Sequence, residues 1–159
     1  WWGDGRPSTP IAAGCRAHPR LVAHGWLARL NLLCDRPLMA VQEMRLRIGA
    51  QIRYSDGVIC ASPLDQTTRT LTDAVAVFEV LSDDSATTDR VVKLIDYAAV
   101  PSLRAYVLLE QTTMAATLFR REPGGEWIAS AQTAGPLVLP GLDISLPLDD
   151  LYRVLTFPA

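Results

Sequence analysis

The sequence has no excess of positive charge, no nucleotide-binding loop and no long apolar run. Its 15 Lys and Arg residues against 17 Asp and Glu residues give a net charge of −2, which excludes a broad electrostatic attraction to nucleic acid. Neither a GxxxxGK nor a GxGxxG pattern occurs, so nucleotide-dependent chemistry is disfavoured. No apolar run approaches the roughly 18 residues of a membrane helix, and the first residues lack a signal pattern. We therefore expect a cytoplasmic protein without a membrane partner.

Cysteine is also scarce. Cys15, Cys34 and Cys60 are odd in number and have no CxxC spacing, so neither a disulfide framework nor a zinc knuckle is indicated. Apolar residues, in contrast, make up 49% of the 159 residues, which is enough for the core of one domain. Because Gly and Pro recur over residues 1–19, we predict an irregular arm there and a single domain over residues 20–159.

The periodicity of apolar residues predicts both helices and strands. Helical spacing predicts a helix from Arg20 that ends before Pro37. The run AVAVFEVL, residues 74–81, is nearly continuous and is typical of a central strand buried on both faces. The other predicted elements are strands around residues 39–48, one strand over 51–60, a polar link over 62–73, a helix over 82–99, strands over 105–111, 114–121 and 127–131, and a strand followed by one helical turn in the segment 137–152.

Two acids lie on neighbouring predicted strands, Asp56 and Glu79. Burying Glu79 at the end of an apolar strand is costly unless a cation or hydrogen-bond donors compensate. If the strands pair in register, both carboxylates lie at one end of the sheet and could hold a hard divalent cation. On the next helix Asp89, Lys93 and Tyr97 follow at intervals of four and share one face. In the functional interpretation of this pattern, the cation polarises a phosphodiester and Lys93 stabilises the charge that develops on it.

Each of these residues has a structural alternative. Asp56 and Gly57 form a strong hairpin-turn signal. On a continuous strand, Asp56 would instead share a face with Tyr54 and Val58. Lys93 could form an ordinary solvated ion pair with the acid one turn before it, and such pairs contribute little stability. The residues alone leave these alternatives open.

Five short motifs occur in a fixed order: YSDGVIC, VFEVLS, TDRVVKLIDYAAVPSLRAYVLLEQ, LFRRE and LPGLDISLPLDDLY. This ordered set resembles the putative restriction endonuclease family of the PD-(D/E)XK nuclease superfamily, and the match covers about residues 17–152 and is dense from Tyr54 to Gln111. The resemblance implies an α/β (α+β) fold, with a restriction-endonuclease-like mixed β-sheet flanked by helices. It also implies a phosphodiesterase that uses Mg²⁺ or Mn²⁺ and acts on DNA, and we expect a homodimer.

Carried over residue by residue, the resemblance implies that Asp56 and Glu79 are metal ligands together with the main-chain carbonyl of Val80. The superfamily's lysine, two residues after the glutamate, is replaced here by Leu81, as is usual in this family. Lys93, on the following helix, then looks like this lysine moved to another position in the chain. Asp56, Glu79 and Lys93 are therefore the catalytic residues that the resemblance implies.

The chain departs from the family pattern at two places. Ser55 stands where the family has a proline before the aspartate, and residues 1–19 do not reproduce the family's glutamate-containing hairpin. Two hypotheses follow. The leading one is a metal-dependent endonuclease, and the alternative is a catalytically degenerate protein that keeps the fold as a dimerising or interaction module.

Overall fold

The computed structural model describes residues 38–65, 67–81 and 88–152 of the chain. The arm predicted over residues 1–19 and the helix predicted from Arg20 lie outside these ranges. The described elements, in chain order, are β1 (Met39–Gln42), β2 (Arg45–Ile48), β3 (Gln51–Tyr54), β4 (Gly57–Cys60), β5 (Thr70–Leu71), β6 (Ala74–Val80), α2 (Thr88–Ala98), β7 (Ala105–Leu109), β8 (Ala116–Arg121), β9 (Trp127–Gln132), β10 (Pro136–Leu139), β11 (Ile144–Pro147) and α3 (Leu148–Tyr152). No helix in the described ranges is long and apolar enough to cross a membrane.

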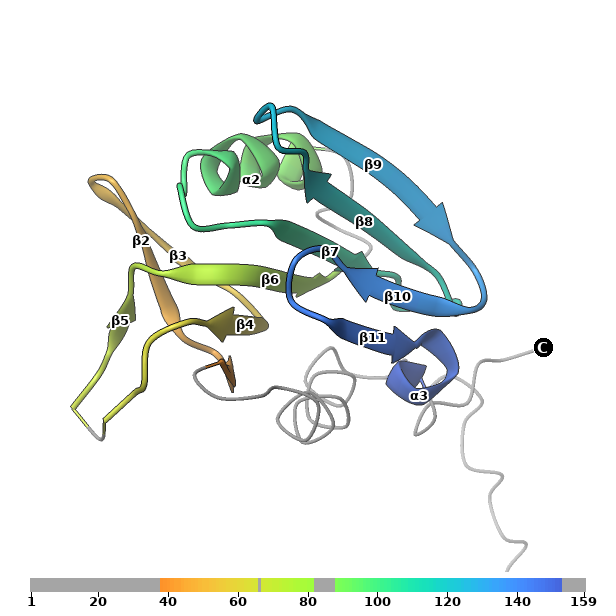
Figure 1. The fold of residues 1–159 in the computed structure, drawn as a ribbon, viewed down its shortest axis with the longest axis horizontal. Helices are drawn as coiled ribbons and strands as arrows, with labels where there is room; N and C mark the ends of the chain where they lie inside the picture. The colour runs from red at the N-terminus through yellow and green to blue at the C-terminus, as the bar shows by residue number, and fades with distance from the viewer. Residues whose placement is uncertain (1–37, 66, 82–87, 153–159) are drawn as a thin grey trace, which may run out of the picture.

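A mixed six-stranded sheet forms the centre of the fold, with the strand order β1-β4-β6-β7-β8-β9 (Figure 1). β6 and β7 are parallel, whereas the other neighbours in this sheet are antiparallel. A parallel pair needs a crossover connection, and the segment that contains α2 supplies it. β3, β2 and β5 form a second sheet, and β10 pairs with β11. The predicted mixed sheet with flanking helices is confirmed.

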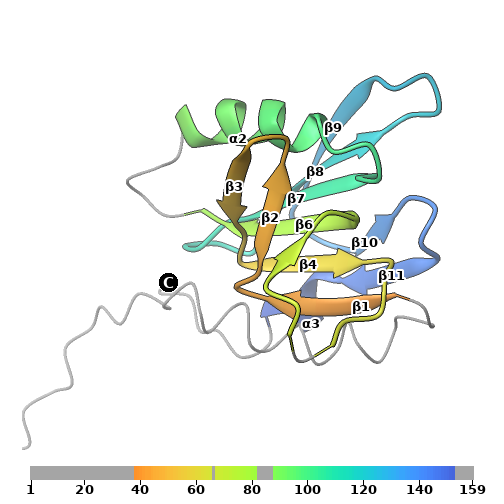
Figure 2. The ribbon, with the colours of Figure 1, turned by 90° about the vertical axis from the view of Figure 1, so that its left-hand side faces the viewer.

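Apolar side chains pack on both faces of the six-stranded sheet. On one face Phe78 and Leu137 belong to a cluster shared with the β10–β11 hairpin and α3. On the other face Val77, Tyr97 and Leu46 belong to a cluster shared with α2 and the three-stranded sheet. Figure 2 shows α2 and the β10–β11 hairpin on opposite sides of β6. All seven residues of β6 are buried, which confirms the predicted central strand.

The single strand predicted over residues 51–60 is wrong. β3 pairs with β2 in the small sheet, whereas β4 pairs with β1 and β6 in the large one. The chain changes sheets at Ser55 and Asp56, and the shared face predicted for Tyr54 and Val58 is lost: Tyr54 is 61% exposed and Val58 is 1% exposed. The hairpin alternative at Asp56 and Gly57 is also wrong, since β3 and β4 do not pair with each other.

Candidate metal centre

Glu79 is a buried acid near the carboxyl end of the apolar strand β6. Two side chains of α2 contact its carboxylate. Glu79 is 5% exposed. The hydroxyl of Tyr97 donates a hydrogen bond of 2.6 Å to Oε1, and Nζ of Lys93 lies 3.4 Å from Oε2. Lys93 and Tyr97 are one helical turn apart, so both reach the same carboxylate. The predicted common face of Lys93 and Tyr97 is confirmed, whereas the side chain of Asp89 lies outside the described residues.

Burial controls the protonation of Glu79. Desolvation raises the pKa of this carboxyl to about 7, against the opposing effects of Lys93 and of the Tyr97 hydrogen bond; the charge of Asp56 raises the pKa further. A nearby cation favours the ionised form of a carboxyl group, because it replaces part of the lost hydration. Glu79 is therefore a group whose ionised form would be stabilised by a divalent ion.

Asp56 directly precedes β4, the strand that pairs with β6, and its charge acts on Glu79. In the antiparallel pairing of β4 with β6, Gly57 is opposite Phe78, so the register extended by one residue sets Asp56 opposite Glu79. Oδ2 of Asp56 accepts a hydrogen bond of 2.7 Å from the N–H of Val80. This bond fixes the direction of the half-buried Asp56 side chain. The sequence-based prediction that the two acids meet at one end of neighbouring strands agrees with this register.

The donor set suits a hard cation. Asp56 and Glu79 offer carboxylate oxygens, and the carbonyl of Val80 remains a predicted third donor. Mg²⁺ usually keeps several waters and takes only one or two protein carboxylates. Among the described residues, no group of three or more His, Cys, Asp or Glu side chains is arranged to hold a metal ion. The residues at this end of β6 thus fit Mg²⁺ or Mn²⁺ bound largely through water.

Two interactions at this end of the sheet were not predicted. The hydrogen bond from Tyr97 to Glu79 goes beyond the helix face predicted for Tyr97, although a tyrosine one turn after Lys93 is a signal that the sequence contains. Arg53 of β3 binds Asp96 of α2 through Nε at 2.8 Å and also through Nη2. Asp96 directly precedes Tyr97, so this pair joins the small sheet to the helix that carries the partners of Glu79.

Comparisons with known proteins agree with this fold. Residues 14–149 match the family described as "Putative restriction endonuclease". The chain is 32% identical over 119 residues to an uncharacterised protein of Synechocystis sp., a match that covers 72% of this chain and 63% of that protein. The crystal structure of a putative nuclease belonging to DUF820 from Anabaena variabilis is similar in fold, with a TM-score of 0.66 at 16% identity, over 91% of this chain and 83% of that one. The chain therefore belongs to the putative restriction endonuclease family that its ordered motifs indicate.

Proposed function

We propose that this protein is a metal-dependent endonuclease that hydrolyses phosphodiester bonds of DNA, with Mg²⁺ or Mn²⁺ held by Asp56, Glu79 and the carbonyl of Val80. The observation that carries the proposal is the position of the buried Glu79 opposite Asp56, with the ammonium group of Lys93 3.4 Å from its carboxylate. Burial raises the pKa of Glu79 to about 7. A bound cation would lower this pKa again, because it favours the ionised carboxylate. A buried carboxyl group with a strongly shifted pKa and a specific charge partner is a candidate functional group.

The side chains around the centre have separable tasks in this proposal. A bound divalent ion would neutralise charge on the phosphate and lower the pKa of a water molecule. The ammonium group of Lys93 lies beside the Glu79 carboxylate. It would stabilise the negative charge that develops on the phosphate oxygens. The N–H of Val80 orients Asp56, and the Tyr97 hydroxyl orients Glu79. Both carboxylates are thus held in place before a cation or substrate arrives.

Calorimetric titration with Mn²⁺ tests the metal site. We expect binding heat from the native chain at about pH 8, where Glu79 is largely ionised, and loss of that heat in the Asp56→Asn/Glu79→Gln double variant. Asp143→Asn is the control: Asp143 is exposed and has φ 53°, which asparagine tolerates. Equal heats from the native chain and the double variant would refute the metal site.

A cleavage assay tests the chemistry. With saturating Mn²⁺, the native chain should nick supercoiled DNA, and Lys93→Met should lower the rate by about 100-fold, the size of effect typical for loss of one stabilising charge. Lys93→Met keeps the aliphatic stem and so limits the change in packing. Metal binding without cleavage of single- or double-stranded DNA would reject the endonuclease and leave the non-catalytic alternative.

A further inference from the structure

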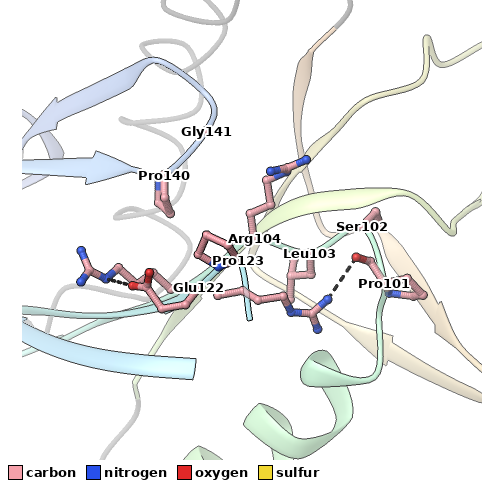
Figure 3. A pocket seen from close by; sticks show the side chains of 10 residues that line it. Pro101, Ser102, Leu103, Arg104, Glu122, Pro123, Pro140 and Gly141 are labelled. Carbon is pink, nitrogen blue, oxygen red and sulfur yellow. Dashed lines mark hydrogen bonds and ion pairs between the residues drawn. The ribbon is translucent and has the colours of Figure 1, made fainter. Parts of the chain in front are cut away.

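We propose that the cavity at the end of the sheet where β6 and β7 begin is a binding pocket for a phosphate group carried on a nucleoside. The cavity has a volume of about 500 Å³ (Figure 3). The N–H of Arg104, one of its lining residues, donates to the carbonyl of Val75 at 2.9 Å. Val75 precedes Glu79 by four residues on β6, which corresponds to roughly 13 Å along the strand. The pocket is therefore a site separate from the candidate metal centre.

The lining carries more positive than negative charge. Its ionisable side chains are those of Arg104, Arg120, Arg121 and Glu122. Nε of Arg120 pairs with Glu122 at 2.9 Å. Arg121 donates to two main-chain carbonyls, that of Pro101 at 3.0 Å and that of Ala98, and a carbonyl carries no net charge. Within the residues that the structure describes, the guanidinium groups of Arg104 and Arg121 thus have no carboxylate partner, in a chain whose net charge is −2.

Arg104 is the guanidinium best placed to meet a ligand. Its main chain is fixed on both sides, since its N–H binds Val75 and its carbonyl accepts from the N–H of Arg121 at 2.9 Å. Its side chain makes no hydrogen bond or ion pair within the part of the chain that the structure describes. It lies against Gly141, where a Cβ would be 3.3 Å from Nη1 and where φ is +68°. Glycine at this turn leaves room for the guanidinium, which a Cβ at residue 141 would crowd; Figure 3 labels both residues.

The remaining walls determine the class of ligand. Pro101, Leu103, Pro123 and Pro140 give the cavity rigid apolar surface. A cavity of this volume lies in the range of small-molecule sites and is far larger than a lone phosphate ion. The planar donors of arginine match the oxygens of a phosphate. A phosphate for the guanidinium group of Arg104, together with a sugar and base for the apolar walls, satisfies both parts of the lining.

Calorimetry in EDTA, without metal, tests the pocket with thymidine, thymidine monophosphate and the dinucleotide TpT at constant salt. We expect the monophosphate to bind and thymidine not to bind. Binding of TpT as well would identify an internal phosphate of a DNA strand as a source of the ligand, and binding of the monophosphate alone would identify a free or terminal phosphate. Equal binding of thymidine and its monophosphate, or binding of neither, would overturn the proposal.

Two charge changes locate the ligand. Arg104→Gln should weaken binding of the monophosphate by about tenfold, as expected for loss of one charge-assisted contact. Glu122→Gln should strengthen it several-fold, because this change removes the carboxylate from the lining and frees Arg120. The matched controls are Arg47→Gln and Glu126→Gln, which make the same charge changes at exposed residues outside the pocket.

A gain of affinity in Glu122→Gln cannot come from a folding defect, so this variant keeps the test decisive. Equal effects of a pocket variant and its matched control would refute a local site. The Asp56→Asn/Glu79→Gln variant should bind the monophosphate like the native chain. Failure of the pocket and failure of the metal centre are therefore distinguished by different titrations.

Discussion

The hydroxyl of Tyr97 donates a hydrogen bond of 2.6 Å to Oε1 of Glu79, and this bond links α2 to the middle of the six-stranded sheet. Tyr97 is fully buried, and its ring lies 4.9 Å from that of Tyr106. Burial and the charge of Glu79 raise the pKa of Tyr97 far above its usual range, so its hydroxyl remains a donor at every working pH. The orientation of Glu79 therefore depends on the packing of a helix against a sheet.

Replacing Tyr97 with phenylalanine should destabilise the fold in a pH-dependent way. At about pH 8 the variant leaves Oε1 of the ionised, buried carboxylate without the Tyr97 donor, and we expect a loss of about 2 kcal/mol, as for a hydrogen bond to a charged group. At about pH 5, where Glu79 is protonated, the loss should be smaller. Urea unfolding at both pH values measures the difference. Tyr54→Phe is the control, because Tyr54 is 61% exposed; an equal loss there would contradict the assigned role.

The stability of the native chain should fall as the pH rises from about 4.5 to about 7. The pKa of Glu79 is raised from 4.5 to about 7 in the folded state, so in this window the folded state binds more protons than the unfolded state. The free energy of unfolding then decreases by about 3 kcal/mol. Glu79→Gln cannot ionise and should remove most of the decrease, as should saturating Mn²⁺. An unchanged pH profile in Glu79→Gln would show that another group is responsible.

Two substitutions at Asp56 should separate folding from metal binding. Asp56→Ala leaves the N–H of Val80 without its acceptor, and we expect a loss of about 1–3 kcal/mol. Asp56→Asn keeps an oxygen that can accept the same bond, so its stability should stay within about 1 kcal/mol of the native value. Both should lose Mn²⁺ affinity. If thermal unfolding finds the two variants equally unstable, the bond of 2.7 Å between Asp56 and Val80 does not stabilise the fold.

The ion pair between Arg53 and Asp96 should stabilise the contact between β3 and α2. A double-mutant cycle with Arg53→Met and Asp96→Asn should give a coupling energy of about 1 kcal/mol. The side chains of Arg53 and Asp96 are 33% and 18% exposed, whereas those of the Arg120–Glu122 ion pair are 49% and 31% exposed. The second pair is more solvated and should give a coupling near zero. Equal coupling energies in the two cycles would show that burial does not decide the difference.

The centre of the sheet could be predicted from local pattern. The run that forms β6 has the composition of a buried strand, and Glu79 is a single acid within it, so element and candidate ligand were both readable. Lys93 and Tyr97 were readable because helical spacing places them on one face. For Glu79, Lys93 and Tyr97 the information lies within a single strand or helix. There the spacing of the side chains along the sequence indicates which of them are buried.

Other features depend on contacts between segments distant in sequence. The alternation of residues 51–60 does not reveal the change of sheet at Asp56, because pairing with β2 or with β6 decides it. β5 has only two residues inside a polar link, and its pairing opposite Arg45 and Leu46 of β2 defines it. Arg53 and Asp96 are 43 residues apart, a separation at which no local period operates. The pocket around Arg104 likewise combines three separate segments.

The short sequence separations at the candidate metal centre bear on how the protein folds. Lys93 and Tyr97 follow Glu79 by 14 and 18 residues, and Val80 follows Asp56 by 24. Closing such loops costs less entropy than joining the ends of the chain, and contacts between residues near in sequence speed folding. The residues that would hold the cation can therefore come together by closing short loops, none of which includes β8, β9, β10 or β11.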